Sequence, residues 1–346
     1  MLVYWCLLLF FVIGTLASRT GVQSRGSFYG LILGGVVLVI VVGLRDQVGG
    51  DWGAYQKMFR HAELIDFTGM LALGDPAYQF LNWVVQRLEW PFWVINLSCA
   101  SIFIWGLVRF SFAQRNPWLA MLVAVPYLVI VVAMGYTRQA VAIGIILLGL
   151  AAMHRGTSVL KFGIYVLVAA LFHKTAVVAI LLVALTGERN KFINIMIVAA
   201  GAVLLYDSLL RNSMDNLMLN YVDAKYSSQG AYIRIALCIV PAAMFLAFRR
   251  RLGFAPHEMS LWRNASFAAF IALFALMITP SSTAVDRISL YLLPLQLAMM
   301  AQLPRILSSE NLAKFALIAY AIAIQFTWLN YATNAYYWLP YHSYLT

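Results

Sequence analysis

Residues 117–134 read PWLAMLVAVPYLVIVVAM, a stretch without a single charged side chain. As a helix it would be about 27 Å long, close to the roughly 30 Å thickness of the hydrocarbon core of a bilayer. Backbone N–H and C=O groups cannot remain unpaired in lipid. The stretch therefore predicts a membrane-spanning helix.

Comparable apolar runs recur along the whole chain. They fall at 1–17, 28–44, 91–110, 138–153, 160–186, 191–206, 232–248, 261–279, 287–303 and 312–330. Of the 346 residues, 63% are hydrophobic and 11% are charged, whereas a soluble domain is nearer a quarter charged. We expect an all-α, polytopic transmembrane helical bundle with 11–12 crossings, formed by one integral membrane domain over residues 1–346.

The distribution of Lys and Arg predicts how the bundle is oriented. Basic residues are enriched in cytoplasmic loops, and residues 249–251 are three consecutive arginines. The other basic connections can lie on the same side of the membrane as this cluster only if run 160–186 enters the membrane and returns to the side it came from. This predicts a V-shaped pair of short helices turning at His173. Both termini are then outside. The net charge of +11 falls on the cytoplasmic side, so the basic composition reflects orientation and nucleic acid is not an expected partner.

Two connections on the outer, periplasmic side are too long to be simple turns. The first covers 45–90 and contains a Gly49-Gly50-Asp51 turn, in which Asp51 is expected to cap the following helix, and an amphipathic interfacial helix that begins near Asp75. The second covers 207–231 and is rich in Asn, Asp and Tyr. Such side chains can bind sugar hydroxyls and stack on sugar rings, although most polar loops are simply solvated.

Ionisable residues at the outer ends of separate helices form the candidate site. They are Arg45, Arg138, His173, Lys174, Arg234, Asp286 and Arg287. One such arginine alone would be explained by contact with lipid headgroups. Several at one membrane depth instead predict a cationic pocket, and the planar guanidinium suits the phosphate oxygens of a lipid diphosphate.

Metal-binding spacing is missing from the sequence. Cys6, Cys99 and Cys238 are isolated in apolar stretches, and Asp46 and Asp51 are too far apart for a paired acidic motif. We expect no metal and no cofactor, with arginines neutralising the diphosphate.

These residues resemble short motifs of the EpsG family of Wzy-like polysaccharide polymerases. The matching pieces, in the order of the family, are Gly43-Leu44-Arg45, residues 48–55 (VGGDWGAY), residues 138–142 (RQAVA), residues 173–176 (HKTA), and Asp286-Arg287 with Tyr291. They span nearly the whole chain. Trp52 departs from the family, which often has Tyr there, but an aromatic ring is retained.

The resemblance implies a metal-independent glycosyltransferase in the bacterial inner membrane, with its active site facing the periplasm. An oligosaccharide repeat unit on undecaprenyl diphosphate would be transferred to the non-reducing-end hydroxyl of another lipid-linked unit, with release of undecaprenyl diphosphate. The product would be a longer O-antigen, capsule or exopolysaccharide chain. Membrane lipids surround such an enzyme, and a chain-length regulator would be a further partner.

The expected roles follow from this chemistry. Arg45, Arg138, Arg287 and Arg234 are expected to bind the diphosphate. His173 and Asp51 are alternative general bases for the attacking hydroxyl. Residues expected to contact the glycan are Asp286, Tyr55, Asn220 and Tyr221.

Three other functions remain open on the sequence. An O-antigen ligase-like transferase would use the same donor with a different acceptor. A flippase or transporter for the same lipid is less favoured, because transport usually leaves ionisable groups near the bilayer midplane and here they gather at one face. A non-catalytic scaffold of a polysaccharide assembly complex is the third.

Overall fold

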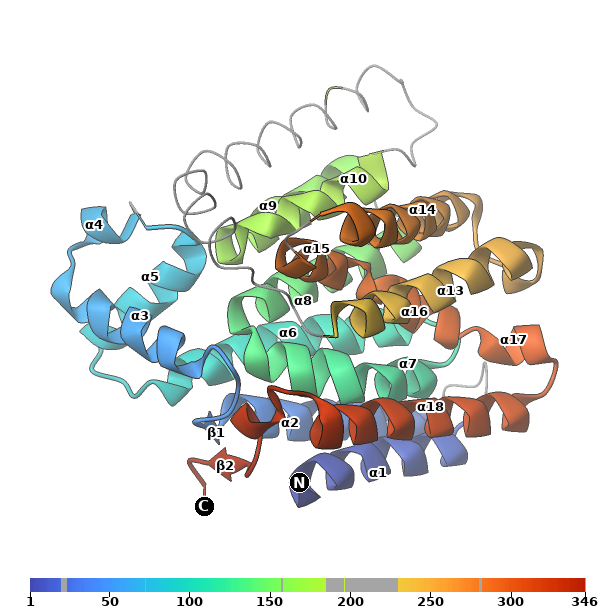
Figure 1. The fold of residues 1–346 in the computed structure, drawn as a ribbon, viewed down its shortest axis with the longest axis horizontal. Helices are drawn as coiled ribbons and strands as arrows, with labels where there is room; N and C mark the ends of the chain where they lie inside the picture. Colours follow the sequence, from blue (N-terminus) through green and yellow to red (C-terminus); the bar gives the residue numbers. More distant parts are fainter. Residues whose placement is uncertain are drawn as a thin grey trace.

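The computed structural model of the protein describes residues 1–19, 24–71, 73–156, 158–184, 196, 230–279 and 282–345. It is an almost entirely helical bundle whose long helices run side by side (Figure 1). Six described helices are long and apolar enough to cross a membrane: α2 (Arg25–Gly43), α6 (Trp93–Ala113), α8 (Thr137–His154), α13 (Ala231–Leu252), most of α14 (Pro256–Ile278) and α18 (Glu310–Tyr331). The predicted all-α membrane bundle is confirmed.

Shorter helical segments complete the described bundle. They are α1 (Leu2–Ala17), α7 (Pro117–Ala124) continued by the π-helix η1 (Val125–Ala133), α9 (Val159–Phe172), α10 (Ala179–Ala184), α15 (Ser282–Ser289), η5 (Leu290–Leu292), α16 (Leu293–Met300) and α17 (Leu303–Leu307). Two of the predicted spans are therefore interrupted helices. The π-helix begins next to Pro126, and the 3-10 turn η5 comes just before Pro294, as expected where proline removes a backbone donor.

Helix α8 forms the centre of the bundle. In its apolar stretch, 83% of the residues are buried inside the protein, compared with 33% in the apolar stretches of α2 and α18. It packs backbone to backbone on α6, because a Cβ on Gly106 would lie 2.0 Å from the Gly144 carbonyl oxygen. Small residues permit this close approach in membrane helices. The N-terminus of α8 is thereby fixed in the middle of one end of the bundle.

The predicted V-shaped pair is present. Helix α9 ends at Phe172, the chain turns at His173, and the 3-10 helix η2 (Lys174–Val178) leads into α10, which runs back alongside α9. The predicted span at 191–206 and the predicted loop at 207–231 lie outside the described residues, except for Met196, Gly230 and Ala231.

One end of the bundle, here called the site end, carries both chain termini and the additional short elements. The helices α3 (Trp52–Leu64), α4 (Phe67–Leu71) and α5 (Pro76–Arg87) project together at the left of Figure 1. The strands β1 (Arg45–Asp46) and β2 (His342–Ser343) form a two-residue antiparallel pair, and η6 (Ala335–Tyr337) precedes β2. Basic residues such as Arg25, Arg155 and those at 249–251 lie at the opposite end.

Candidate active site

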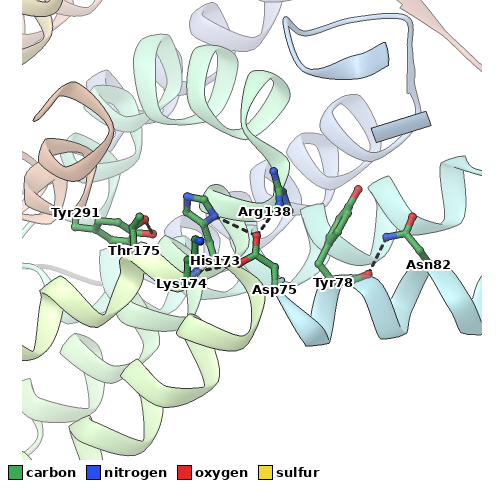
Figure 2. A network of polar contacts seen from close by, with 8 residues as sticks. All are labelled: Asp75, Tyr78, Asn82, Arg138, His173, Lys174, Thr175 and Tyr291. Carbon is green, nitrogen blue, oxygen red and sulfur yellow. Dashed lines mark hydrogen bonds and ion pairs between the residues drawn. The ribbon is translucent and has the colours of Figure 1, made fainter. Parts of the chain in front are cut away.

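The Asp75 carboxylate, at the start of α5, gathers groups from two other parts of the chain. Its Oδ2 accepts a hydrogen bond from Arg138 Nη1 at 2.6 Å and lies 3.5 Å from His173 Nδ1, and its Oδ1 accepts from the Lys174 N–H at 3.0 Å (Figure 2). Burial alone would raise the pKa of Asp75, but the interactions with His173, Arg138 and the Lys174 amide bring the pKa below its usual value. Asp75 is an ionised anchor at neutral pH.

The backbone of Asp75 is shaped for this contact. Pro76 occupies the first turn of α5, so Asp75 stands at the helix cap, but its side chain makes no capping hydrogen bond. Its φ of 57° is in the left-handed region, which a non-glycine residue rarely adopts. Strained backbone of this kind is concentrated at functional sites, where surrounding contacts hold it in place.

Four consecutive residues at the N-terminus of α8 contact three different segments. Tyr136 lies under the Arg287 guanidinium, with 5.6 Å between the Arg287 Cζ atom and the ring centroid. The Thr137 hydroxyl accepts from Arg45 at 2.8 Å, Arg138 donates to Asp75, and Gln139 Nε2 donates to the Arg287 carbonyl at 2.6 Å. Segments separated along the chain therefore converge at residues 136–139.

Arg287 and Asp51 present unpaired charges at this convergence. The Arg287 side chain is exposed, and within the described part of the chain its guanidinium makes no hydrogen bond or ion pair. The half-buried Asp51 carboxylate likewise has no hydrogen-bond partner there. Burial raises the pKa of Asp51, and Arg287, Arg138 and His173 oppose that rise, so these three side chains lie within electrostatic range of Asp51.

A comparison of the sequence with protein families identifies the family of the chain. The model described as the EpsG family matches residues 27–343, nearly the whole chain. The chain belongs to the EpsG family. Membership indicates a membrane-bound Wzy-like polysaccharide polymerase, a glycosyltransferase-like activity in polysaccharide biosynthesis. No curated protein and no solved structure matches the chain.

The short EpsG-like motifs, scattered in sequence, meet at the site end. The motif at 173–176 reaches Asp75 through His173 and Lys174, and its Thr175 hydroxyl lies 3.1 Å from the Tyr291 hydroxyl. Arg287 contacts Gln139 of the 138–142 motif and the neighbouring Tyr136. The motifs therefore form one site.

Arg45 differs from its predicted role. Its side chain is fully buried, Nε donates to the Val48 carbonyl at 3.2 Å, and Nη2 donates to Thr137. A guanidinium enclosed in this way cannot reach a diphosphate without leaving these partners. The geometry instead assigns Arg45 to holding the 48–51 turn against the start of α8, which corrects the prediction of direct phosphate binding.

The Gly49 turn needs glycine for two reasons. Its φ is +110°, and a Cβ there would lie 2.1 Å from the Met134 carbonyl oxygen. This turn sets the direction in which Asp51 enters α3. Asp51 occupies the cap position but makes no side-chain capping hydrogen bond, contrary to the expectation that it caps the helix.

The C-terminal segment is a support that the sequence interpretation missed. The Tyr337 carbonyl accepts from the Gly49 N–H at 2.9 Å. The Trp338 indole is buried against Gly135 and donates from Nε1 to the Ile130 carbonyl at 2.8 Å. An aromatic run after the last apolar stretch was compatible with an interfacial belt, and only tertiary contacts distinguish that from a buried anchor.

The predicted glycan residues have mixed outcomes. Tyr55 is 3% exposed and packs beneath Arg138, with 5.8 Å from the Arg138 Cζ atom to the ring centroid, so it is not available for stacking on a sugar. Asp286 is buried and pairs with Arg234 through two hydrogen bonds of 2.6 and 2.7 Å. Asn220 and Tyr221 lie outside the described residues.

Asp75 was the main residue that sequence reasoning did not include in the site. The Asp75-Pro76 pair was interpreted only as a helix start, and no local signal distinguishes a capping aspartate from one turned toward a distant arginine. Among the described residues, no group of three His, Cys, Asp or Glu side chains is placed to hold a metal ion.

Proposed function

We propose that the protein polymerises oligosaccharide repeat units carried on undecaprenyl diphosphate, at the periplasmic face of a bacterial inner membrane. The donor glycan passes to the non-reducing-end hydroxyl of an acceptor unit, and undecaprenyl diphosphate leaves. The observation that carries this proposal is that Arg138 and His173 meet at Asp75 while Arg287 contacts the start of α8, all at one end of a membrane bundle.

The leaving diphosphate accumulates negative charge as the glycosidic bond breaks. Among the described residues the Arg287 guanidinium makes no hydrogen bond or ion pair, and the Arg138 side chain, held by Asp75 through Nη1, remains 23% exposed. Preorganised donors aimed at developing charge supply a large part of the rate of many enzymes. We assign Arg138 and Arg287 to the diphosphate, and Arg45 to positioning.

His173 is the first candidate for the base that takes the proton from the acceptor hydroxyl. Its Nδ1 faces Asp75, and Figure 2 shows the second ring nitrogen, Nε2, on the side away from that carboxylate. A carboxylate beside one ring nitrogen favours the tautomer in which the other can accept a proton. Asp75 is then a positioning residue.

Asp51 is the second candidate for the general base. Its carboxylate has no hydrogen-bond partner among the described residues, and burial raises its pKa toward a range better suited to proton transfer. Asp51→Asn and His173→Gln discriminate the two, since loss of the true base should remove the acidic limb of the pH–rate profile. Retention of that limb in one variant assigns the base to the other residue.

The distribution of basic side chains supports a periplasmic position of the site. Basic side chains lie at the end opposite the site, and enrichment of basic residues on the cytoplasmic side would place the site outside. Both termini would then be periplasmic as well. Labelling of a Cys introduced at Thr346 by a membrane-impermeant reagent in intact spheroplasts tests this, and labelling only after lysis would contradict it.

The experiment that tests the function uses purified protein and a synthetic lipid-linked repeat unit in EDTA. A ladder of longer lipid-linked glycans is expected. Transfer only to lipid A core would instead identify a ligase, and transport without covalent extension would identify a flippase. Dependence on an added divalent cation would contradict the proposed metal independence.

A further inference from the structure

A cavity of about 510 Å³ lies between α13 and α18, near the site end of both helices. On α18 it extends from Tyr331 to Tyr320, roughly 16 Å along the helix axis. Its volume is within the range of about 300–1,000 Å³ usual for ligand sites. It is therefore an elongated site of ligand size, separate from the Asp75 network.

The walls of the cavity change in character along its length. Deeper in the bundle they are mainly apolar, with Leu237, Ala323 and Ile324. Toward the site end the lining includes Arg234, Thr333 and Asn334. A ligand with a hydrocarbon chain and a polar head fits this gradient.

The cavity is connected to the proposed diphosphate site by adjacent residues. Arg234, on its lining, pairs with Asp286, and the next residue is Arg287. A lipid chain lying between α13 and α18 would therefore have its head near Arg287.

We propose that this cavity holds the head-proximal isoprene units of a polyprenyl diphosphate, with the phosphate next to the chain at the polar end lined by Arg234, Thr333 and Asn334. The inference rests on the proposed function, and it names the surface that recognises the lipid part of the substrate. Bulk phospholipid is the rival occupant.

The test uses geranylgeranyl diphosphate as the probe, with binding to detergent-solubilised full-length protein measured by native mass spectrometry. Ala323→Trp fills the cavity and should weaken binding by tenfold or more. Ala316→Trp is the matched control, because Ala316 is exposed on the same helix two turns deeper and does not line the cavity.

Unchanged binding in folded Ala323→Trp protein would overturn the inference, as would equal retention of phosphatidylglycerol by the wild type. Polymerisation of a lipid-linked repeat is measured on the same preparations. If wild-type protein polymerises but Ala323→Trp binds the probe normally, the cavity assignment fails and the proposed function stands. If Ala323→Trp blocks binding but the wild type makes no polymer, the function fails and the lipid site stands.

Discussion

Arg138 Nη1 lies 2.6 Å from Asp75 Oδ2, and this ion pair joins the first turn of α8 to the cap of α5 across 63 residues of sequence. The Arg138 side chain is 23% exposed, whereas Asp75 is 6% exposed. The buried Asp75 carboxylate thus anchors an arginine whose side chain remains partly exposed. Such an arrangement fixes a guanidinium for a ligand while leaving part of it unused.

Removing the Asp75 charge should affect the reaction more than the fold. Asp75→Asn keeps the shape of the side chain but weakens the hold on His173 and Arg138, so we expect turnover to fall on the order of 10²-fold or more. The pH–rate profile should shift as well. Asp66→Asn is the control, since Asp66 is an exposed aspartate that accepts hydrogen bonds from its neighbours Thr68 and Gly69. Equal activity of Asp75→Asn and wild type would contradict the positioning role.

Replacing Arg138 tests the geometry of the donor. Arg138→Lys keeps the positive charge but loses the planar fork, so polymer should be nearly absent at wild-type protein abundance. We expect a loss on the order of 10²–10³ in rate. Arg60→Ala, an exposed substitution on α3, should leave polymer length unchanged on a gel of extracted polysaccharide. Full-length polymer in the Arg138→Lys strain would remove Arg138 from the site.

Asp51→Asn should stabilise the fold while lowering the activity of the protein. Burial raises the pKa of Asp51, so the ionised carboxylate costs folding free energy above its folded pKa and costs nothing below the unfolded value of about 3.8. The unfolding temperature of Asp51→Asn should therefore exceed that of wild type by roughly 2 °C at pH 7, with the difference shrinking as the pH falls toward 4. A lower unfolding temperature at pH 7 would show that the carboxylate has a stabilising partner.

The Gly49 turn provides a matched pair of glycine substitutions. Gly49→Ala meets both an unfavourable φ and the Met134 carbonyl, so the unfolding temperature should drop by roughly 5–10 °C. Gly53→Ala has nothing within 4 Å of the added Cβ and should be neutral or slightly stabilising. The thermal unfolding of the two purified variants measures the difference, and similar values would refute the close packing of the turn.

The sequence predicted most of the bundle because lipid imposes strong rules. Long charge-free runs have to be helices. Placing the basic connections on one side of the membrane required a turn at His173, which the α9–η2–α10 pair confirms. The site was harder to predict, because burial decides the role of each arginine. Arg45 and Arg287 look alike in sequence, yet one is enclosed by backbone carbonyls and the other is exposed. Contacts such as Asp75 with Arg138 leave no local pattern.

A double-mutant cycle tests whether Arg138 and Arg287 act on the same diphosphate. The rate of a single repeat-unit transfer would be measured for wild type, Arg138→Ala, Arg287→Ala and the double variant, in protein that is folded in each case. We expect each single variant to lose on the order of 10²-fold or more, and the double variant to lose far less than the product of the two. Losses that simply multiply, or a single variant with wild-type rate, would contradict the account.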